Sequence, residues 1–378
     1  MGTPTQRHLW LDVLRTILII EVILIHTTAP FRGVADLTTW IPVHLLTPII
    51  KTCIPLFFMI TGALILPRAK DESISRYLLV KPALMALVVI VWELVYRLTT
   101  QHLWGDSFEL LSMLKDVANG NQKDPVLWYM YRIMGVYMAA PFLSVIVSHV
   151  STRRLTTYVI AAISLEVFCR LLSDFSGVQW WPPFDHRIYG LWFGFTAAGY
   201  LVAHRINEKT FRPAFWSALF VLGYGITLVA IFLGRINGKQ GGHFFTGYDD
   251  PGIAIMSVAI FGIFFTMRQR INQVAVKPLW TALGASTLGI YVIHEPILLI
   301  LRQYFPTRSA VVSVFIYTAV ALVASYALTA ILNRIPLVSY LVSLGPRSKA
   351  RNTGNHFLRT TASSSPADSS QGIRTMEK

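Results

Sequence analysis

The chain has 378 residues, of which 54% are hydrophobic and only 14% are charged. Soluble domains carry about 25% charged residues, so a soluble fold with this composition would lack the polar side chains needed to cover its core. The composition excludes an ordinary soluble enzyme and predicts an all-α protein, a polytopic bundle of membrane helices. The net charge of +14 does not indicate nucleic-acid binding, because the Lys and Arg residues follow the predicted membrane topology.

About ten apolar segments are predicted to cross the membrane. They cover residues 11–29, 43–66, 82–99, 126–147, 157–172, 187–203, 214–233, 250–267, 279–301 and 310–332. Lys and Arg are more frequent in the connections on the side of the N-terminus than on the other side, which places both termini in the cytoplasm. The first segment lacks a small-residue cleavage site, so we expect a retained helix rather than a signal peptide.

Two regions follow from this pattern. Residues 8–340 are predicted to form the membrane-embedded domain, and residues 345–378 a disordered, basic, Ser/Thr-rich cytoplasmic tail. The two cysteines, Cys53 and Cys169, both fall in apolar segments and predict neither a disulfide framework nor a metal site.

The first apolar segment contains Arg15 and His26, eleven residues apart. This spacing is close to three helical turns, so both side chains share one face, about 16 Å apart along the axis. Asp12 lies three residues before Arg15 and can pair with it. Ionisable groups inside a membrane are costly and are usually functional. A structural contact between helices is the alternative interpretation of His26.

Further polar residues are predicted at matching depths. His294 in the ninth segment lies about as far from the cytoplasmic side as His26, which predicts a cavity that opens outward. Arg15, the basic loop 67–81, which includes Arg76 and Lys81, and Lys277 form a separate positive entrance on the cytoplasmic side. This arrangement suits a phosphate-bearing donor whose reactive end must reach the far side. A transporter or flippase for a lipid-linked saccharide is the alternative, although we find no inverted repeat that would favour it.

Several sequence blocks resemble the acyltransferase 3 family of integral-membrane O-acyltransferases. They are "LDVLR" with ten residues between Arg15 and His26, "IPLFFMITGALIL", "LWYMYRIMGVYMAAPFL", "IYGLWFGFTAAGYLV" and "LGASTLGIYVIHEPIL". Thr61 stands where the family usually has Ser, and Val126 where many members have His. The resemblance covers about residues 8–340. It extends to the subgroup without an appended esterase domain, which includes enterobacterial common antigen and xanthan-type exopolysaccharide acetyltransferases.

The resemblance implies an enzyme of the bacterial cytoplasmic (inner) membrane. Its members transfer an acyl group, most often acetyl from cytosolic acetyl-CoA as co-substrate, to a sugar hydroxyl of a polysaccharide or of its lipid-linked repeat unit. The expected partners are acetyl-CoA, the glycan or lipid-linked oligosaccharide, and membrane lipid. No bound cofactor and no metal are expected, and the sequence does not indicate an oligomeric state.

Roles can be assigned on this basis. His26 is expected to be the catalytic base, with an acyl-histidine relay as the variant, because imidazole titrates near neutrality. Arg15, Asp12, Arg76 and Lys81 are expected at the donor site. The candidates for acceptor contacts or for the donor to the oxyanion are Thr61, Trp128, Tyr129, Tyr291 and His294. The sequence does not choose among them, and Trp128 and Tyr129 also suit interfacial anchors.

Overall fold

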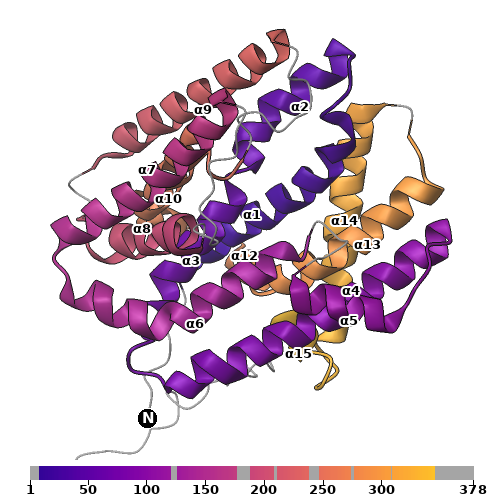
Figure 1. Cartoon of the computed structure of the whole chain (residues 1–378), viewed down its shortest axis with the longest axis horizontal. Coiled ribbons are helices and arrows are strands. Elements are labelled where there is room, and N and C mark those ends of the chain that lie inside the picture. Colours follow the sequence, from indigo (N-terminus) through magenta and orange to yellow (C-terminus); the bar gives the residue numbers. More distant parts are fainter. Residues whose placement is uncertain are drawn as a thin grey trace, which may run out of the picture.

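The computed structural model describes residues 8–120, 126–176, 188–207, 211–237, 247–273, 276–307 and 309–344. The predicted tail therefore lies outside the described residues. The residues described form helices and no strand, which confirms the all-α prediction (Figure 1). The helices are α1 (Leu9–Thr28), η1 (Ala29–Phe31), α2 (Leu37–Ile50), α3 (Cys53–Ile65), η2 (Arg76–Val80), α4 (Lys81–Trp104), α5 (Leu110–Asn119), α6 (Trp128–His149), α7 (Thr152–Ser176), η3 (Ile188–Trp192), α8 (Phe193–His204), α9 (Pro213–Ile236), α10 (Pro251–Thr266), α11 (Arg268–Ile271), α12 (Lys277–Ala285), α13 (Thr287–Tyr304), α14 (Ala310–Leu332) and α15 (Tyr340–Ser343).

Every predicted membrane segment coincides with a helix, but fewer than ten meet a length and composition test for spanning. Six stretches do so within the described ranges, or seven when the bent pair α12 and α13 is taken as one span. The six are Leu37–Ile65, Arg76–Trp104, Trp128–His149, Thr152–Ser173, Pro213–Ile236 and Ala310–Leu332. A multi-pass membrane protein is thus supported, whereas the count of ten and the orientation of the termini stay predictions.

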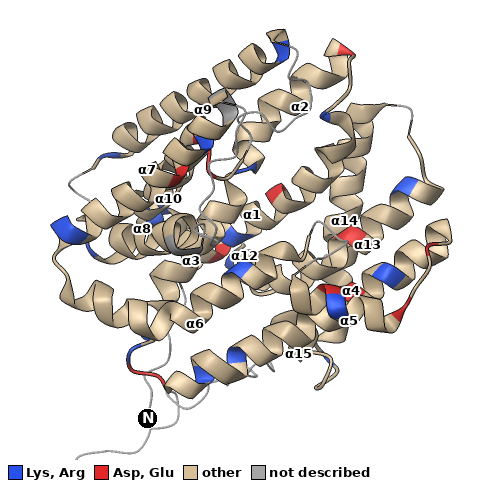
Figure 2. Ribbon diagram, in the orientation of Figure 1, with Lys and Arg blue, Asp and Glu red and all other residues tan. Residues whose placement is uncertain are grey.

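The physical reason for the smaller count lies in particular helices. In α1, any stretch of 18 residues contains Asp12, Arg15 and Glu21, so its charge is high for a lipid-facing span. Helix α10 has only 16 residues, although it carries no charged side chain. Figure 2 shows the contrast between such uncharged helices, including α14, and the helices that carry Lys, Arg, Asp or Glu.

Helix α1 lies in the middle of the bundle (Figure 1). It packs against α12, α13 and α14 and against α2 and α3, and most of its residues are buried. A helix that is surrounded by protein rather than by lipid can place its ionisable side chains against other polar groups. This position explains why the charged residues of α1 are tolerated.

Helices α12 and α13 set the position of the residues that face α1. The two helices are bent by 68° at Ser286. At Gly284 a Cβ atom would lie 2.9 Å from the Cα of Asp12, so only glycine allows α12 to approach α1 this closely. Pro296 has no N–H and leaves the carbonyl of Val292 without its helical donor. The hydroxyl of Tyr96 on α4 donates to that carbonyl at 2.8 Å and stabilises the helix at this point.

Candidate active site

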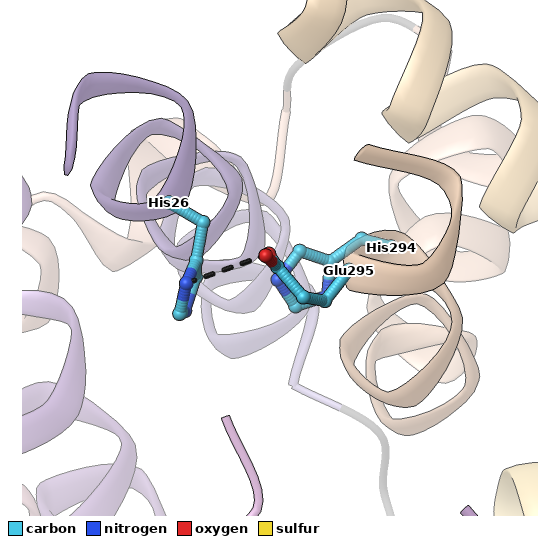
Figure 3. A group of neighbouring side chains, drawn as sticks. All are labelled: His26, His294 and Glu295. Carbon is cyan, nitrogen blue, oxygen red and sulfur yellow. Dashed lines mark ion pairs between the residues drawn. The ribbon is translucent and has the colours of Figure 1, made fainter. Parts of the chain in front are cut away.

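Three ionisable side chains from α1 and α13 meet near the C-terminal end of α1 (Figure 3). The ring centroids of His26 and His294 lie 5.2 Å apart, so the two histidines do share one depth. Nδ1 of His26 lies 3.5 Å from Oε2 of Glu295. Only 5% of the Glu295 side chain is exposed, whereas 15% of His26 is. The pair is therefore held inside the bundle, while His26 keeps some access.

Arg302 joins the two helices at this point. Its Nη1 lies 3.1 Å from Oε1 of Glu295, and its Nη2 donates to the backbone carbonyl of His26 at 2.9 Å. A single guanidinium thus holds both the carboxylate and the backbone that carries the imidazole. Glu295 and Arg302 were not among the residues predicted from the sequence. Their spacing of seven residues places them two turns apart on one face of α13, which is the signal that could have identified them.

The hydrogen bonds of His294 determine which of its nitrogens carries the proton. Its Nδ1 lies 2.6 Å from the carbonyl of Tyr291, and because a carbonyl can only accept, Nδ1 must donate. Its Nε2 is buried and has no hydrogen-bond partner among the described residues. His294 is fully buried. His26 is thus the more accessible of the two, and with Glu295 at its Nδ1 it presents Nε2 as the free base.

A cavity of about 320 Å³ lies between α1, α3, α4, α6 and α13. Its lining includes Arg15, Val22 and Tyr291. Arg15 and Val22 are two helical turns apart, about 10 Å along α1, and His26 is one further turn beyond Val22. The cavity thus extends from Arg15 toward the pair of His26 and Glu295.

The residues expected at the donor site lie at different distances from this cavity. Arg15 lines it, and Asp12 lies 3.7 Å from the guanidinium, as the spacing predicts. Nζ of Lys81 lies 5.3 Å from the ring centroid of Tyr137, which also lines the cavity. Lys81 therefore contacts a residue of the cavity lining but does not line the cavity itself.

Arg76 lies farther out. Its side chain is 63% exposed and pairs with Glu72 at 3.4 Å. Glu72 also lies 3.9 Å from Lys81. Arg76 does not line the cavity. It could therefore contact only a part of the donor that protrudes from the cavity.

The candidates for the oxyanion donor differ in whether their hydroxyl is already engaged. Thr61, Tyr129 and Tyr291 all line the cavity. The hydroxyl of Thr61 donates to the carbonyl of Phe57 at 2.9 Å, and that of Tyr291 donates to the carbonyl of Val126. The hydroxyl of Tyr129 has no hydrogen-bond partner among the residues described. The geometry thus favours Tyr129, a choice that the sequence left open.

The other two candidates have different surroundings. His294 uses its one N–H on the backbone and cannot donate to a substrate as the neutral ring. Trp128 packs on Tyr248, with ring centroids 5.5 Å apart and an interplanar angle of 29°. Both rings belong to an aromatic cluster that adjoins Tyr129.

The ligand atoms of His26, His294 and Glu295 all lie within 4.8 Å of one another, so these residues could hold a metal ion. Two imidazoles and a carboxylate are a donor set found at zinc sites. However, Arg302 pairs with the carboxylate, and the charges of Arg32 and Lys51 also act on His26. These positive charges oppose a divalent cation, so the surroundings favour proton transfer over metal binding.

The fold and this site define a multi-pass membrane protein with an imidazole and a carboxylate paired near a cavity inside the bundle. The chain matches the family model described as an acyltransferase domain over residues 8–330. It belongs to this acyltransferase 3 family, as the resemblance predicted, and is a membrane acyltransferase. No curated protein and no solved structure matches the chain. The narrower likeness to enterobacterial common antigen and xanthan-type enzymes stays a prediction.

Proposed function

We propose that the protein is an O-acyltransferase of the bacterial inner membrane. It transfers an acyl group, most often acetyl, from cytosolic acyl-CoA to a sugar hydroxyl on the outer side. The acceptor is a cell-surface or extracellular polysaccharide or its lipid-linked repeat unit. The observation that supports this best is the position of His26, which Glu295 and Arg302 hold one turn beyond a cavity that contains Arg15.

The donor binds from the side of Arg15. A guanidinium can hold a phosphate oxygen pair in a bidentate manner, so Arg15 binds the phosphates of CoA, with Lys81 close by. The lining between Arg15 and Tyr291 is largely apolar and suits the thin pantetheine arm. The thioester then reaches the His26 end of the cavity while the nucleotide stays at the cytoplasmic surface.

At that end, Nε2 of His26 takes the proton of the sugar hydroxyl as the hydroxyl oxygen attacks the thioester carbonyl. Glu295 accepts a hydrogen bond from Nδ1–H and stabilises the imidazolium, and the hydroxyl of Tyr129 donates to the oxyanion. When the C–S bond breaks, the leaving thiolate takes the proton from His26. The products are the sugar ester and free CoA. An acyl-histidine relay is the variant.

The test uses the purified protein in liposomes, with labelled acetyl-CoA on the Arg15 side and candidate glycans on the other. We expect acetyl ester on the glycan, and a loss of about 10²- to 10⁴-fold in rate for His26→Ala, the usual contribution of a general base. His44→Ala is the matched control, because His44 is also buried but its Nδ1 bonds the carbonyl of Trp40 within α2 and its ring stacks on that of Trp40.

A transporter would behave differently in the same vesicles. Glycan that crosses the bilayer without modification, at a rate that His26→Ala does not change, would overturn the proposal. The relay variant is recognised by labelled acetyl on His26 when acceptor is absent. Far-UV circular dichroism and thermal melting show whether each variant is folded.

A further inference from the structure

Two cations near His26 lack a carboxylate partner among the residues that the structure describes. Arg32 follows η1, and its Nη2 donates to the backbone carbonyl of Ile25 at 2.6 Å. Its Nε is buried and has no hydrogen-bond partner within the described part of the chain. Lys51 ends α2, and its Nζ lies 4.9 Å from the ring centroid of Tyr248. The charges of both residues act on His26 and on each other.

The nearest acidic groups do not neutralise this pair. Asp249 and Asp250 also act on Lys51, but neither lies within ion-pair distance of it. Asp250 lies 3.9 Å from Arg170 and accepts a hydrogen bond from the backbone of Gly247, so it is engaged elsewhere. A partly buried cation without a paired carboxylate is costly, and proteins retain such cations where an anionic ligand completes the site.

An aromatic wall adjoins the two cations. Tyr248, which lies under Lys51, packs on Trp128, and Trp192 lies 6.2 Å from Tyr248 between ring centroids. Nε1 of Trp192 is buried and has no hydrogen-bond partner among the described residues. The ring centroids of Trp128 and Tyr129 lie 6.5 Å apart, so this aromatic wall adjoins the candidate donor to the oxyanion. Aromatic faces pack well on the C–H face of a sugar ring, and an indole N–H can bond a hydroxyl.

We propose that the acceptor is an anionic saccharide, and that Arg32 and Lys51 bind its phosphate or carboxylate while the sugar packs on this aromatic wall. This inference rests on the proposed function, because it names the acceptor for the same reaction. Two sources supply such an anion. One is the diphosphate that links a saccharide to its polyprenyl carrier, and the other is the carboxylate of an acidic sugar in a polymer. In both cases the anion fixes the sugar so that one hydroxyl faces His26.

The test measures binding without any acyl donor, so that it does not depend on transfer. The full-length protein in nanodiscs of zwitterionic lipid is titrated with three probes. They are a neutral oligosaccharide, the same oligosaccharide with one uronic acid, and the neutral oligosaccharide on a prenyl diphosphate. We expect at least one anionic probe to bind about tenfold or more tightly than the neutral one. The tighter probe identifies the source of the anion.

Substitutions of Arg32 and Lys51 test whether these two cations cause the preference for the anionic probe. Arg32→Gln and Lys51→Gln should each reduce it at least about fivefold and leave binding of the neutral probe within about twofold. Arg32→Lys keeps the charge and should keep most of the preference, which separates charge from the bond to Ile25. Arg235→Gln is the control, because Arg235 donates to the carbonyl of Ala35, covers the ring of Trp40 and is not among the charges that act on His26.

Equal binding of all three probes by the native protein would overturn the inference. So would an equal loss for neutral and anionic probes in Arg32→Gln and Lys51→Gln, since that pattern indicates a structural role. A preference for the anionic probe without acetyl ester on any acceptor would leave the anion site standing and overturn the proposed function instead.

Discussion

The two ends of the cavity differ in how their charges are held. At the Arg15 end, Arg15 and Lys81 pair with carboxylates at 3.7 and 3.9 Å, and 31% of the Arg15 side chain is exposed. At the His26 end, Arg302 contacts Glu295 at 3.1 Å within α13 and the carbonyl of His26 at 2.9 Å, and the second contact joins α13 to α1. The two arginines are similarly exposed, at 31% and 28%, so the ends differ in contact distance rather than in hydration. Loosely paired cations suit ligand binding by charge, and closely paired groups suit a reaction that requires fixed geometry.

The largest effect among the following changes is expected at the His26 end. Glu295→Gln keeps the shape of the side chain but removes the charge that orients and stabilises the His26 imidazole. We expect kcat to fall at least about 10²-fold, with the KM for acetyl-CoA little changed. Steady-state kinetics in liposomes measure both quantities.

Glu93→Gln is the matched control for this change, because Glu93 is also buried, pairs with Arg97 at 2.8 Å and is not among the residues that line the cavity. It should lower the melting temperature but not kcat of the folded protein. If Glu295→Gln behaves in the same way, the two ends of the cavity do not differ as proposed.

The substitution Tyr129→Phe removes only the hydroxyl, which has no hydrogen-bond partner among the described residues. We expect kcat to fall by about 10²-fold, the usual effect of removing one oxyanion donor, without loss of stability. Tyr137→Phe changes the lining of the same cavity and serves as the control. Equal activity of the native protein and Tyr129→Phe would contradict this role for Tyr129. Thr61 and Tyr291 would then be the remaining candidates for the oxyanion donor, and their hydroxyls would have to rotate away from their present acceptors.

Arg15→Gln should act on binding rather than on chemistry. Because Arg15 is partly hydrated, we expect the KM for acetyl-CoA to rise by about tenfold, with kcat reduced less than threefold. The rise should be smaller for acetyl-pantetheine, which lacks the nucleotide phosphates. A fall in kcat with unchanged donor affinity would remove Arg15 from the donor site.

The smallest effect is expected from a chelator. If the pair of His26 and Glu295 transfers protons, dialysis against EDTA should leave the rate of acetyl transfer unchanged. Loss of activity that zinc restores, together with one metal per chain by elemental analysis, would show that His26, His294 and Glu295 hold an ion instead.

The sequence predicted which segments are helical more reliably than it predicted how many helices span the membrane. Each predicted segment is helical because long apolar runs permit few other structures in a membrane. Helix α1 shows what the sequence leaves open: its composition resembles a span, and its burial among other helices is a property of the bundle. The bend at Ser286 likewise separates a predicted single segment into α12 and α13.

The sequence alone determined that Arg15 and His26 lie on one face of one helix, because their spacing sets their relative direction. It also placed His294 at the depth of His26. Only the tertiary structure decided that Glu295 and Arg302 hold His26, and that Tyr129, unlike Thr61 and Tyr291, has a hydroxyl without a hydrogen-bond partner among the described residues. The contacts of His26 with Glu295 and Arg302, and that of Tyr291 with Val126, join residues more than a hundred positions apart. They depend on the rotation of each helix about its axis and on the side-chain rotamers, neither of which a local pattern specifies.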